Sequence, residues 1–197
     1  VGAIVKVQVS APGFVTVRRE LEVKADGPLE LSLELRPEDA AIESAFVHGL
    51  SEQSKLLRFM FGLRDLTPTM LSRFTQIDYD RELALVAVID TPDGEQQIGV
   101  ARYTALPDGE TCEFAVVVAD AWQGRGLGWR LMELLIEVAR QRELKAMVGH
   151  ILASNKGMLA LCARLGFAIA HNAEDPTQKR ATLRLESLAG NLLQLAR

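Results

Sequence analysis

Apolar and polar residues alternate along much of the first 35 residues, and this alternation predicts strands. The runs Ile4–Val9 and Phe14–Val23 are separated by a turn at Ala11–Gly13. A third run, Leu29–Leu35, alternates leucine with glutamate or serine. A period of two over several residues is typical of a half-buried strand.

The spacing of apolar residues then changes to that of helices. Arg36–Asp39 is typical of a helix start, because proline suits the first turn and acids suit the N-terminus. The stripe that follows consists of Ile42, Phe46 and Leu50. A second helix is predicted after Ser51, with Leu56, Leu57, Met60 and Phe61 as its apolar residues. A third begins at Thr67–Pro68, with Thr67 as its cap.

Three further strands are predicted at Glu82–Asp90, Gln97–Leu106 and Thr111–Ala119. They are joined by short turns rich in proline, aspartate and glycine, which favour an antiparallel meander. The last of them contains a run, Phe114–Ala119, that is apolar on both faces, as expected of a central strand.

Helices and strands alternate in the C-terminal part. A strongly amphipathic helix follows Gly126, with a stripe made of Leu127, Leu131, Leu134, Leu135 and Val138. Later elements are predicted as a strand at Ala146–Leu152, a helix at Asn155–Leu165 closed by Gly166, and strands at Phe167–His171 and Ala181–Glu186. The tail after Ser187 has leucines at helical spacing.

Composition places the chain among ordinary globular proteins. Of 197 residues, 48% are hydrophobic and 24% are charged, and the net charge is −4. This charge disfavours nucleic-acid binding, and no apolar run reaches the length of a membrane span. Cys112 and Cys162 lie in apolar segments without metal-ligand spacing, so we expect no disulfide, no metal and a cytoplasmic, reducing location. Because the sequence begins with Val1, we expect a piece of a longer protein.

A glycine-rich segment between a strand and a helix is the strongest candidate for chemistry. Gln123-Gly124-Arg125-Gly126-Leu127-Gly128 leaves backbone amides free at a helix start, where a pyrophosphate can bind. Its spacing is neither that of a dinucleotide fold nor that of a P-loop. A glycine-rich connection that serves tight packing alone is the alternative.

This segment resembles the acyl-CoA signature of the GNAT superfamily of N-acetyltransferases. The order of elements from Leu29 to Glu186 also resembles that family. The segments Arg36–Ala40 and Arg73–Glu82 resemble bacterial protein-lysine acetyltransferases of the Pat type. The resemblance implies an α/β (α+β) fold with a mixed seven-stranded sheet and four or five helices. It also implies that the fourth and fifth strands splay apart around acetyl-CoA.

The domain organisation that follows has three parts. Residues 1–20 form an unassigned β extension, residues 21–188 the acetyltransferase domain, and residues 189–197 a C-terminal tail. The extension is the expected remnant of a preceding module.

The resemblance also assigns cofactor residues. Acetyl-CoA would bind to Gln123, Gly124, Arg125, Gly126, Leu127 and Gly128, to the strand residues Val116, Val117 and Val118, and to Asn155. Amides between Val117 and Ala119 would polarise the thioester carbonyl. The alternative for Arg125 is a surface arginine that contacts no ligand. The alternative for Asn155 is a helix cap.

Glu113 is the predicted general base. It is the only acid in Cys112–Ala119, and we expect it to be buried there. A solvent-facing strand end is the alternative for this residue, and Glu143 and His150 are other candidates for the base. Cys162 stands where many family members carry a tyrosine that acts as general acid, which puts a tyrosine-assisted mechanism in doubt.

The predicted function is transfer of an acetyl group from acetyl-CoA to an amine by direct attack, with a protein lysine as acceptor. Acetylation of a small-molecule amine is the alternative within the same chemistry. A non-catalytic acetyl-CoA sensor and a pure interaction module are alternatives of other classes. A homodimer is a candidate assembly, and neither nucleic acid nor membrane is an expected partner.

Overall fold

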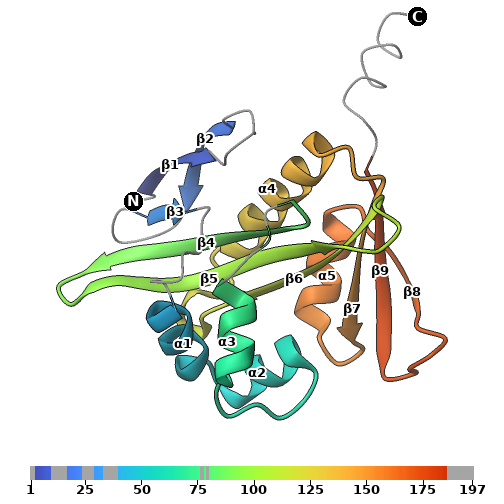
Figure 1. Cartoon of the computed structure of the whole chain (residues 1–197), viewed down its shortest axis with the longest axis horizontal. Coiled ribbons are helices and arrows are strands. Elements are labelled where there is room, and N and C mark those ends of the chain that lie inside the picture. The colour runs from blue at the N-terminus through green and yellow to red at the C-terminus, as the bar shows by residue number, and fades with distance from the viewer. Residues whose placement is uncertain are drawn as a thin grey trace, which may run out of the picture. The chain divides into compact units, whose positions relative to one another are not determined.

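The computed structural model describes residues 3–9, 17–23, 29–32, 40–75, 78 and 80–185. These residues form five α-helices, a short 3₁₀ helix and nine strands (Figure 1). The predicted helix start at Arg36–Asp39 and the predicted tail at 189–197 lie outside them. Among the helices of this part of the chain, none has the length and apolar character needed to cross a membrane.

The main sheet confirms the predicted seven-stranded mixed architecture. Its strand order is β3-β4-β5-β6-β7-β9-β8. The bounds are β3 Leu29–Ser32, β4 Glu82–Thr91, β5 Gly94–Ala105, β6 Thr111–Val118, β7 Ala146–Leu152, β8 Ala168–His171 and β9 Gln178–Arg184. β6 and β7 are parallel, whereas β3–β4, β7–β9 and β9–β8 are antiparallel. β5 lies between β4 and β6, as the predicted meander requires.

Two further strands form a separate antiparallel pair. β1 (Ala3–Val9) pairs with β2 (Val17–Val23) over their full length, from Ala3↔Val23 to Val9↔Val17. β2 runs across the predicted boundary between residues 20 and 21, and the division of the chain into domains stays a prediction.

The chain divides into two compact units. The first contains residues 1–102 and 116–131, and the second contains residues 103–115 and 132–197. β5, β6 and the helix α4 (Leu127–Gln141) each contribute residues to both units.

In the first unit, α1 (Ala40–Gly49), α2 (Glu52–Phe59) and α3 (Pro68–Thr75) lie on one side of β4 and β5 (Figure 1). Its core consists of Phe46, Val47, Leu50 and Leu63 packed with Ala84, Val86, Val88 and Val100. Thr67 caps α3 as predicted, because its hydroxyl accepts the Met70 amide at 3.2 Å. The predicted stripe of α1 is confirmed at Phe46 and Leu50.

The predicted second helix forms as α2, but polar residues of this helix are buried more deeply than its apolar ones. Leu56 and Phe61 are exposed, with 40% and 52% of their surface accessible, whereas Ser54 and Lys55 are buried. The Lys55 ammonium donates to the Arg64 carbonyl at 2.9 Å. Polar partners therefore determine which face of this helix turns inward, and the helix ends at Phe59, before a left-handed residue.

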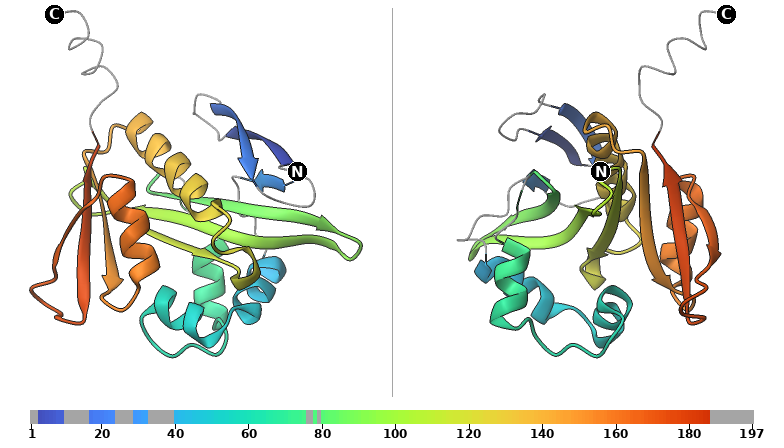
Figure 2. Two further views of the ribbon diagram at one scale, coloured as in Figure 1. Left: turned by 180° about the vertical axis from the view of Figure 1, so that it is seen from behind. Right: turned by 45° about the vertical axis from the view of Figure 1, so that its right-hand side comes forward.

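In the second unit, α5 (Lys156–Arg164) lies against the strands β7, β9 and β8 (Figure 2). Gly166 follows α5 with φ of 89°, in agreement with its predicted role as a helix stop. β9 begins at Gln178, three residues before the predicted Ala181, because the polar residues Gln178–Arg180 also pair with β7.

Candidate active site

The connection between β6 and α4 has the backbone geometry of an anion-binding loop. Gly124 and Gly126 have φ of 72° and 90°, a region that side chains disfavour. A Cβ atom at either position would have no heavy atom within 4 Å, so the loop is open on that side. α4 begins at Leu127, and the first amides of a helix have no intrahelical partner. The loop therefore suits a phosphate group.

The predicted charged residue of this loop lies on its surface. Arg125 is exposed, and its guanidinium lies 5.0 Å from the ring centre of Trp122 in a cation–π contact. The first turn of α4 carries no acidic residue that would compete for the helix N-terminus. The binding role of Arg125 stays a prediction.

The side chain of Gln123 links the loop to α2 and to the end of β6. Its Nε2 donates to the Val118 carbonyl at 3.0 Å and to the Ser54 hydroxyl at 3.1 Å. Both hydrogens of the amide are thereby used. The backbone N–H of Gln123 also has a partner, the Asp120 carbonyl at 3.3 Å, so the N–H groups of this residue are in use and its cofactor contact stays a prediction.

Asp120 joins this loop to α2, a connection that the sequence analysis missed. Its carboxylate accepts the Ser51 amide at 2.9 Å, the Ser51 hydroxyl at 2.7 Å and the Ser54 hydroxyl at 2.7 Å. Partial burial raises the pKa of Asp120, but the hydrogen bonds from Ser51 and Ser54 outweigh it, and the net pKa lies below the ordinary value. An acid between an apolar strand and a glycine-rich loop is the only sequence signal for this contact.

The residues just before the loop, Val116–Ala119, differ in side-chain burial and in whether their backbone amide has a partner. Val117 packs against the core of the first unit, and Val116 and Val118 are half-buried. The Ala119 amide donates to the Ile98 carbonyl at 2.8 Å, so the expectation that it polarises a thioester is wrong. The amides of Val117 and Val118 remain candidates for that role.

A close approach of β5 holds the start of α4 in place. A Cβ at Gly99 would lie 3.2 Å from Leu131 Cδ1 and 3.4 Å from both Leu127 Cδ2 and the Val117 oxygen. The Leu127 side chain is buried, so this residue reaches the loop only through its backbone. Gly128 is half-buried in the first turn of the helix.

Glu113 lies on β6 in the second unit with its side chain exposed, and the expectation of burial is wrong. The alternation of the strand explains the difference, because its neighbours Cys112 and Phe114 point into the core and Glu113 points away from it. Accessible to solvent, the carboxylate can exchange a proton with water or with an approaching amine. Its role as base stays a prediction.

β6 and β7 stop pairing soon after Glu113. Among the described residues, the register runs from Thr111↔Ala146 to Glu113↔Val148 and ends there. The ring of Phe114 then lies beside Gly149, where a Cβ would be 2.6 Å from Phe114 Cζ. The Phe114 ring also packs on Phe167, with the ring centres 5.1 Å apart.

The other predicted residues of the second unit have local partners. Asn155 caps α5 by accepting the Met158 amide at 3.0 Å, and its cofactor contact stays a prediction. His150 is half-buried, and its Nδ1 lies 3.4 Å from the side-chain nitrogen Nδ2 of Asn172. Glu143 is exposed just after α4, in a left-handed conformation with φ of 59°.

Neither described candidate for a general acid is suited to the role. Burial raises the pKa of the Cys162 thiol to about 12, and it raises the pKa of the Tyr103 hydroxyl to about 12 as well. Tyr79, the remaining tyrosine, lies outside the described residues.

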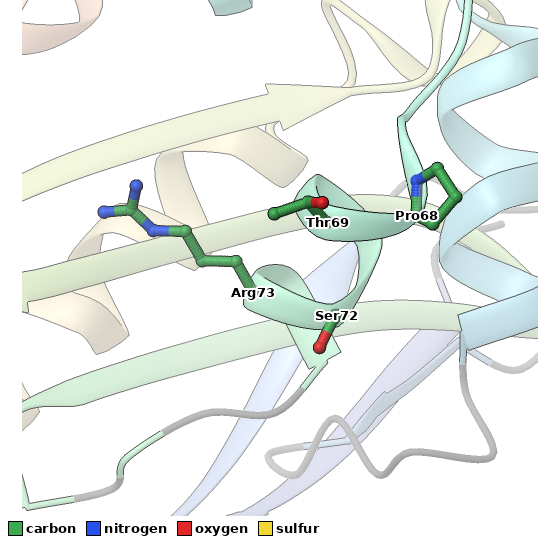
Figure 3. Close-up of a pocket in the computed structure, with 4 residues that line it drawn as sticks. All are labelled: Pro68, Thr69, Ser72 and Arg73. Carbon is green, nitrogen blue, oxygen red and sulfur yellow. The ribbon is translucent and has the colours of Figure 1, made fainter.

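Two surface hollows lie in the first unit. A shallow pocket of about 560 Å³ is lined by Pro68, Thr69, Ser72 and Arg73 on one side of α3 (Figure 3). The other, of about 300 Å³, is lined by residues of α1, by Glu95–Gln97 at the start of β5, and by Ala119. Ala119 is the residue that this pocket shares with the predicted site.

A buried carboxylate ties α1 to β5 next to the second pocket. Glu43 is 2% exposed, and its carboxylate accepts a hydrogen bond from the side-chain amide of Gln97 at 2.7 Å. The Arg102 guanidinium lies 3.9 Å from the same carboxylate, donates to the Phe74 carbonyl at 3.2 Å and covers the Phe74 ring at 4.5 Å. Phe74 belongs to the segment Arg73–Glu82, so this segment has a structural role in the first unit.

Comparison with known families identifies the chain. Residues 53–167 match the model of the acetyltransferase (GNAT) family. The chain belongs to this family. The match begins in α2 and ends just after α5, and it includes the whole β6–α4 loop. GNAT enzymes use acetyl-CoA as the acetyl donor.

Individual relatives agree with this assignment. An acetyltransferase from Pseudomonas aeruginosa is 37% identical over 154 residues, which are 78% of this chain and 82% of the relative. An L-methionine sulfoximine/L-methionine sulfone acetyltransferase from Pseudomonas paraeruginosa is 41% identical over 69 residues, or 35% of this chain and 40% of that protein.

The fold is similar to that of a solved GNAT domain. The GNAT domain of S. lividans PAT superposes with a TM-score of 0.71 and 24% identity, over 91% of this chain and 97% of that domain. This likeness concerns the fold, and it extends over the sheet and helices described above.

Proposed function

We propose that this GNAT acetyltransferase transfers the acetyl group of acetyl-CoA to the side-chain amine of a protein lysine. The observation that carries the proposal is the β6–α4 loop, with Gly124 and Gly126 left-handed and open ahead of the α4 N-terminus. Acetyl-CoA carries a pyrophosphate, and such a loop offers backbone amides and a helix dipole to that group.

In this proposal the β6–α4 loop binds acetyl-CoA, and Glu113 accepts a proton from the acceptor amine. The amides from Gly124 to Gly128 would hold the pyrophosphate, and Arg125 would add charge. Asn155 is proposed as a further cofactor contact. A lysine amine with a pKa near 10.4 is protonated at neutral pH and must lose a proton before it attacks the thioester. The exposed carboxylate of Glu113 is suited to accept that proton, directly or through water.

The acceptor assignment is supported by the resemblance of Arg36–Ala40 and Arg73–Glu82 to protein-lysine acetyltransferases and by the fold likeness to the PAT domain. The exposure of Glu113 fits an amine that is presented by another macromolecule. One observation favours a second candidate, a small amino compound, because the methionine sulfoximine acetyltransferase shares 41% identity over 69 residues.

The donor site is tested by the shift in melting temperature with excess acetyl-CoA. A ligand at 100 times its dissociation constant stabilises a protein by about 2.7 kcal/mol. Gly124→Glu should abolish the shift, because it places a side chain and a negative charge in the loop. Gly109→Glu is the matched control, since Gly109 has φ of 70° and no heavy atom within 4 Å of its Cβ position. An unchanged shift in Gly124→Glu would contradict the proposed donor site.

The acceptor is tested by incubating the protein with radiolabelled acetyl-CoA and three amines: a lysine-rich protein, free lysine, and L-methionine sulfoximine. Faster transfer to the protein supports the proposal. Faster transfer to either small molecule replaces it with the second candidate. Binding of acetyl-CoA without transfer to any of the three would favour a sensor.

A further inference from the structure

We propose that Asp120 is a positioning residue that holds the β6–α4 loop in its ligand-binding form through Ser54 and Gln123 and thereby links acetyl-CoA binding to α2. This inference rests on the proposed function, because it concerns the same loop. All its residues lie in the first unit.

The direction of each hydrogen bond follows from counting protons. The Ser54 and Ser51 hydroxyls each have one hydrogen, and both lie 2.7 Å from Asp120 Oδ1. A carboxylate is an acceptor only, so both hydroxyls donate to it. Their lone pairs are then left to accept the Gln123 amide at 3.1 Å and the Ser54 backbone amide at 3.2 Å.

The charge at Asp120 is therefore necessary for the whole arrangement. Three donors meet its two oxygens, because the Ser51 amide binds Oδ2 while the two hydroxyls bind Oδ1. An asparagine would place an NH₂ group at one of these oxygens and would face at least one of the donors with another donor. Asp120→Asn is thus a disruptive change despite its identical shape.

Gln123 carries the effect of Asp120 into the loop. Its amide is held by Ser54 on α2 and by the Val118 carbonyl at the end of β6. Gly124, the next residue, is the first left-handed position of the loop. Fixing Gln123 from both sides orders the following amides before a ligand arrives, which lowers the entropy lost on binding.

Coupling between two sites is reciprocal. If the serines order the loop, a ligand on the loop must in turn strengthen the hydrogen bonds at the start of α2. Bound CoA should then slow hydrogen exchange of the amides of Ser54 and Lys55, although α2 itself has no part in holding the pyrophosphate.

The test compares Asp120→Asn, Ser54→Ala and Gln123→Ala with the wild-type protein. The matched control is Asp108→Asn, because Asp108 also accepts two amides, from Glu110 and Thr111, but does so at the β5–β6 turn of the second unit. The measurements are the dissociation constant of CoA by calorimetry, KM for acetyl-CoA against kcat, and hydrogen exchange in α2. All are made well below each variant's melting temperature.

We expect each of the three variants to raise the CoA dissociation constant and KM for acetyl-CoA by about tenfold, as loss of one well-placed hydrogen bond does. kcat should stay within twofold, and Asp108→Asn should behave as wild type. The double variant Asp120→Asn/Gln123→Ala should be no weaker than either single one, because both act through one link. CoA should slow exchange in α2 of the wild type and not in Ser54→Ala.

The outcomes separate this inference from the proposed function. A wild-type protein that fails to bind CoA contradicts the proposed function itself. A wild-type protein that binds CoA, with variants that bind it equally well or with additive losses in the double variant, overturns the role of Asp120. If Ser54→Ala unfolds, Gln123→Ala still decides, because Gln123 is an exposed residue.

Discussion

The ring of Phe114 occupies the space beside Gly149 that any larger residue at 149 would need. This contact comes one residue after the β6–β7 register ends at Glu113↔Val148. A glycine beside a large ring thus lies where the β6–β7 register ends.

Gly149→Ala should destabilise the protein by about 1–3 kcal/mol, because the added methyl overlaps a ring that Phe167 also holds. Urea unfolding followed by circular dichroism measures the change. Gly157→Ala is the control, since only Asn155 Oδ1 lies near its Cβ position, at 4.0 Å. Inside α5 the same exchange should stabilise by up to about 1 kcal/mol. Equal effects at both positions would show that Phe114 moves aside freely.

Glu113→Gln should lower kcat by about 10²- to 10⁴-fold and leave KM for acetyl-CoA nearly unchanged, because it removes a proton acceptor without altering shape. Steady-state kinetics with a saturating amine measure this. Glu110→Gln, in the turn before β6, is the exposed control. A normal rate in Glu113→Gln, combined with a slow His150→Gln, would move the base to His150.

Alkaline pH should destabilise the fold through its two cysteines. Burial raises the pKa of the Cys112 and Cys162 thiols from 9.0 to about 12. Between these values the unfolded chain loses protons that the folded chain keeps, so stability is present below pH 9 and is lost as the pH rises toward 12. Unfolding free energies at pH 7, 9 and 10 check the sign. Replacing both cysteines with alanine should flatten the dependence, and a slope that stays the same would assign it to Tyr103 instead.

Arg102→Met should destabilise the first unit by about 3–5 kcal/mol, because it leaves the Glu43 carboxylate buried without its cation. The double variant Arg102→Met/Glu43→Gln should recover most of that loss, since an amide can be buried at lower free-energy cost than a charge. Thermal unfolding of the single and double variants measures both values. Failure of Glu43→Gln to rescue would assign the role of Arg102 to its contacts with Phe74.

The sequence predicted the architecture well where apolar periodicity alone decides it. The bounds of β7 and the caps Thr67 and Asn155 agree with the structure, since each depends on nearby residues. The burial of Ser54 in α2 could not be predicted, because its partner Asp120 lies far along the chain. Local periodicity carries no information on a partner 66 residues away.

In the candidate site, too, some features follow from local sequence and others depend on distant residues. The glycines of the β6–α4 loop have the left-handed backbone that their pattern indicates. The burial of Glu113 was predicted wrongly, because an apolar run was read as buried on both faces and Glu113 points to the exposed one. The Ala119 amide already donates to Ile98 of β5. The sequence does not specify which residues of β5 and β6 pair, so this bond could not be predicted.

The alternation of the chain between its two units bears on the order in which they can form during synthesis. All residues of the first unit precede residue 132, whereas the second unit contains β9, which ends at residue 184. In the sequence, residues 103–115 of the second unit lie between the two segments of the first. During synthesis, Asp120 and its hydrogen-bond partners Ser51, Ser54 and Gln123 therefore all emerge before β7, the parallel partner of β6.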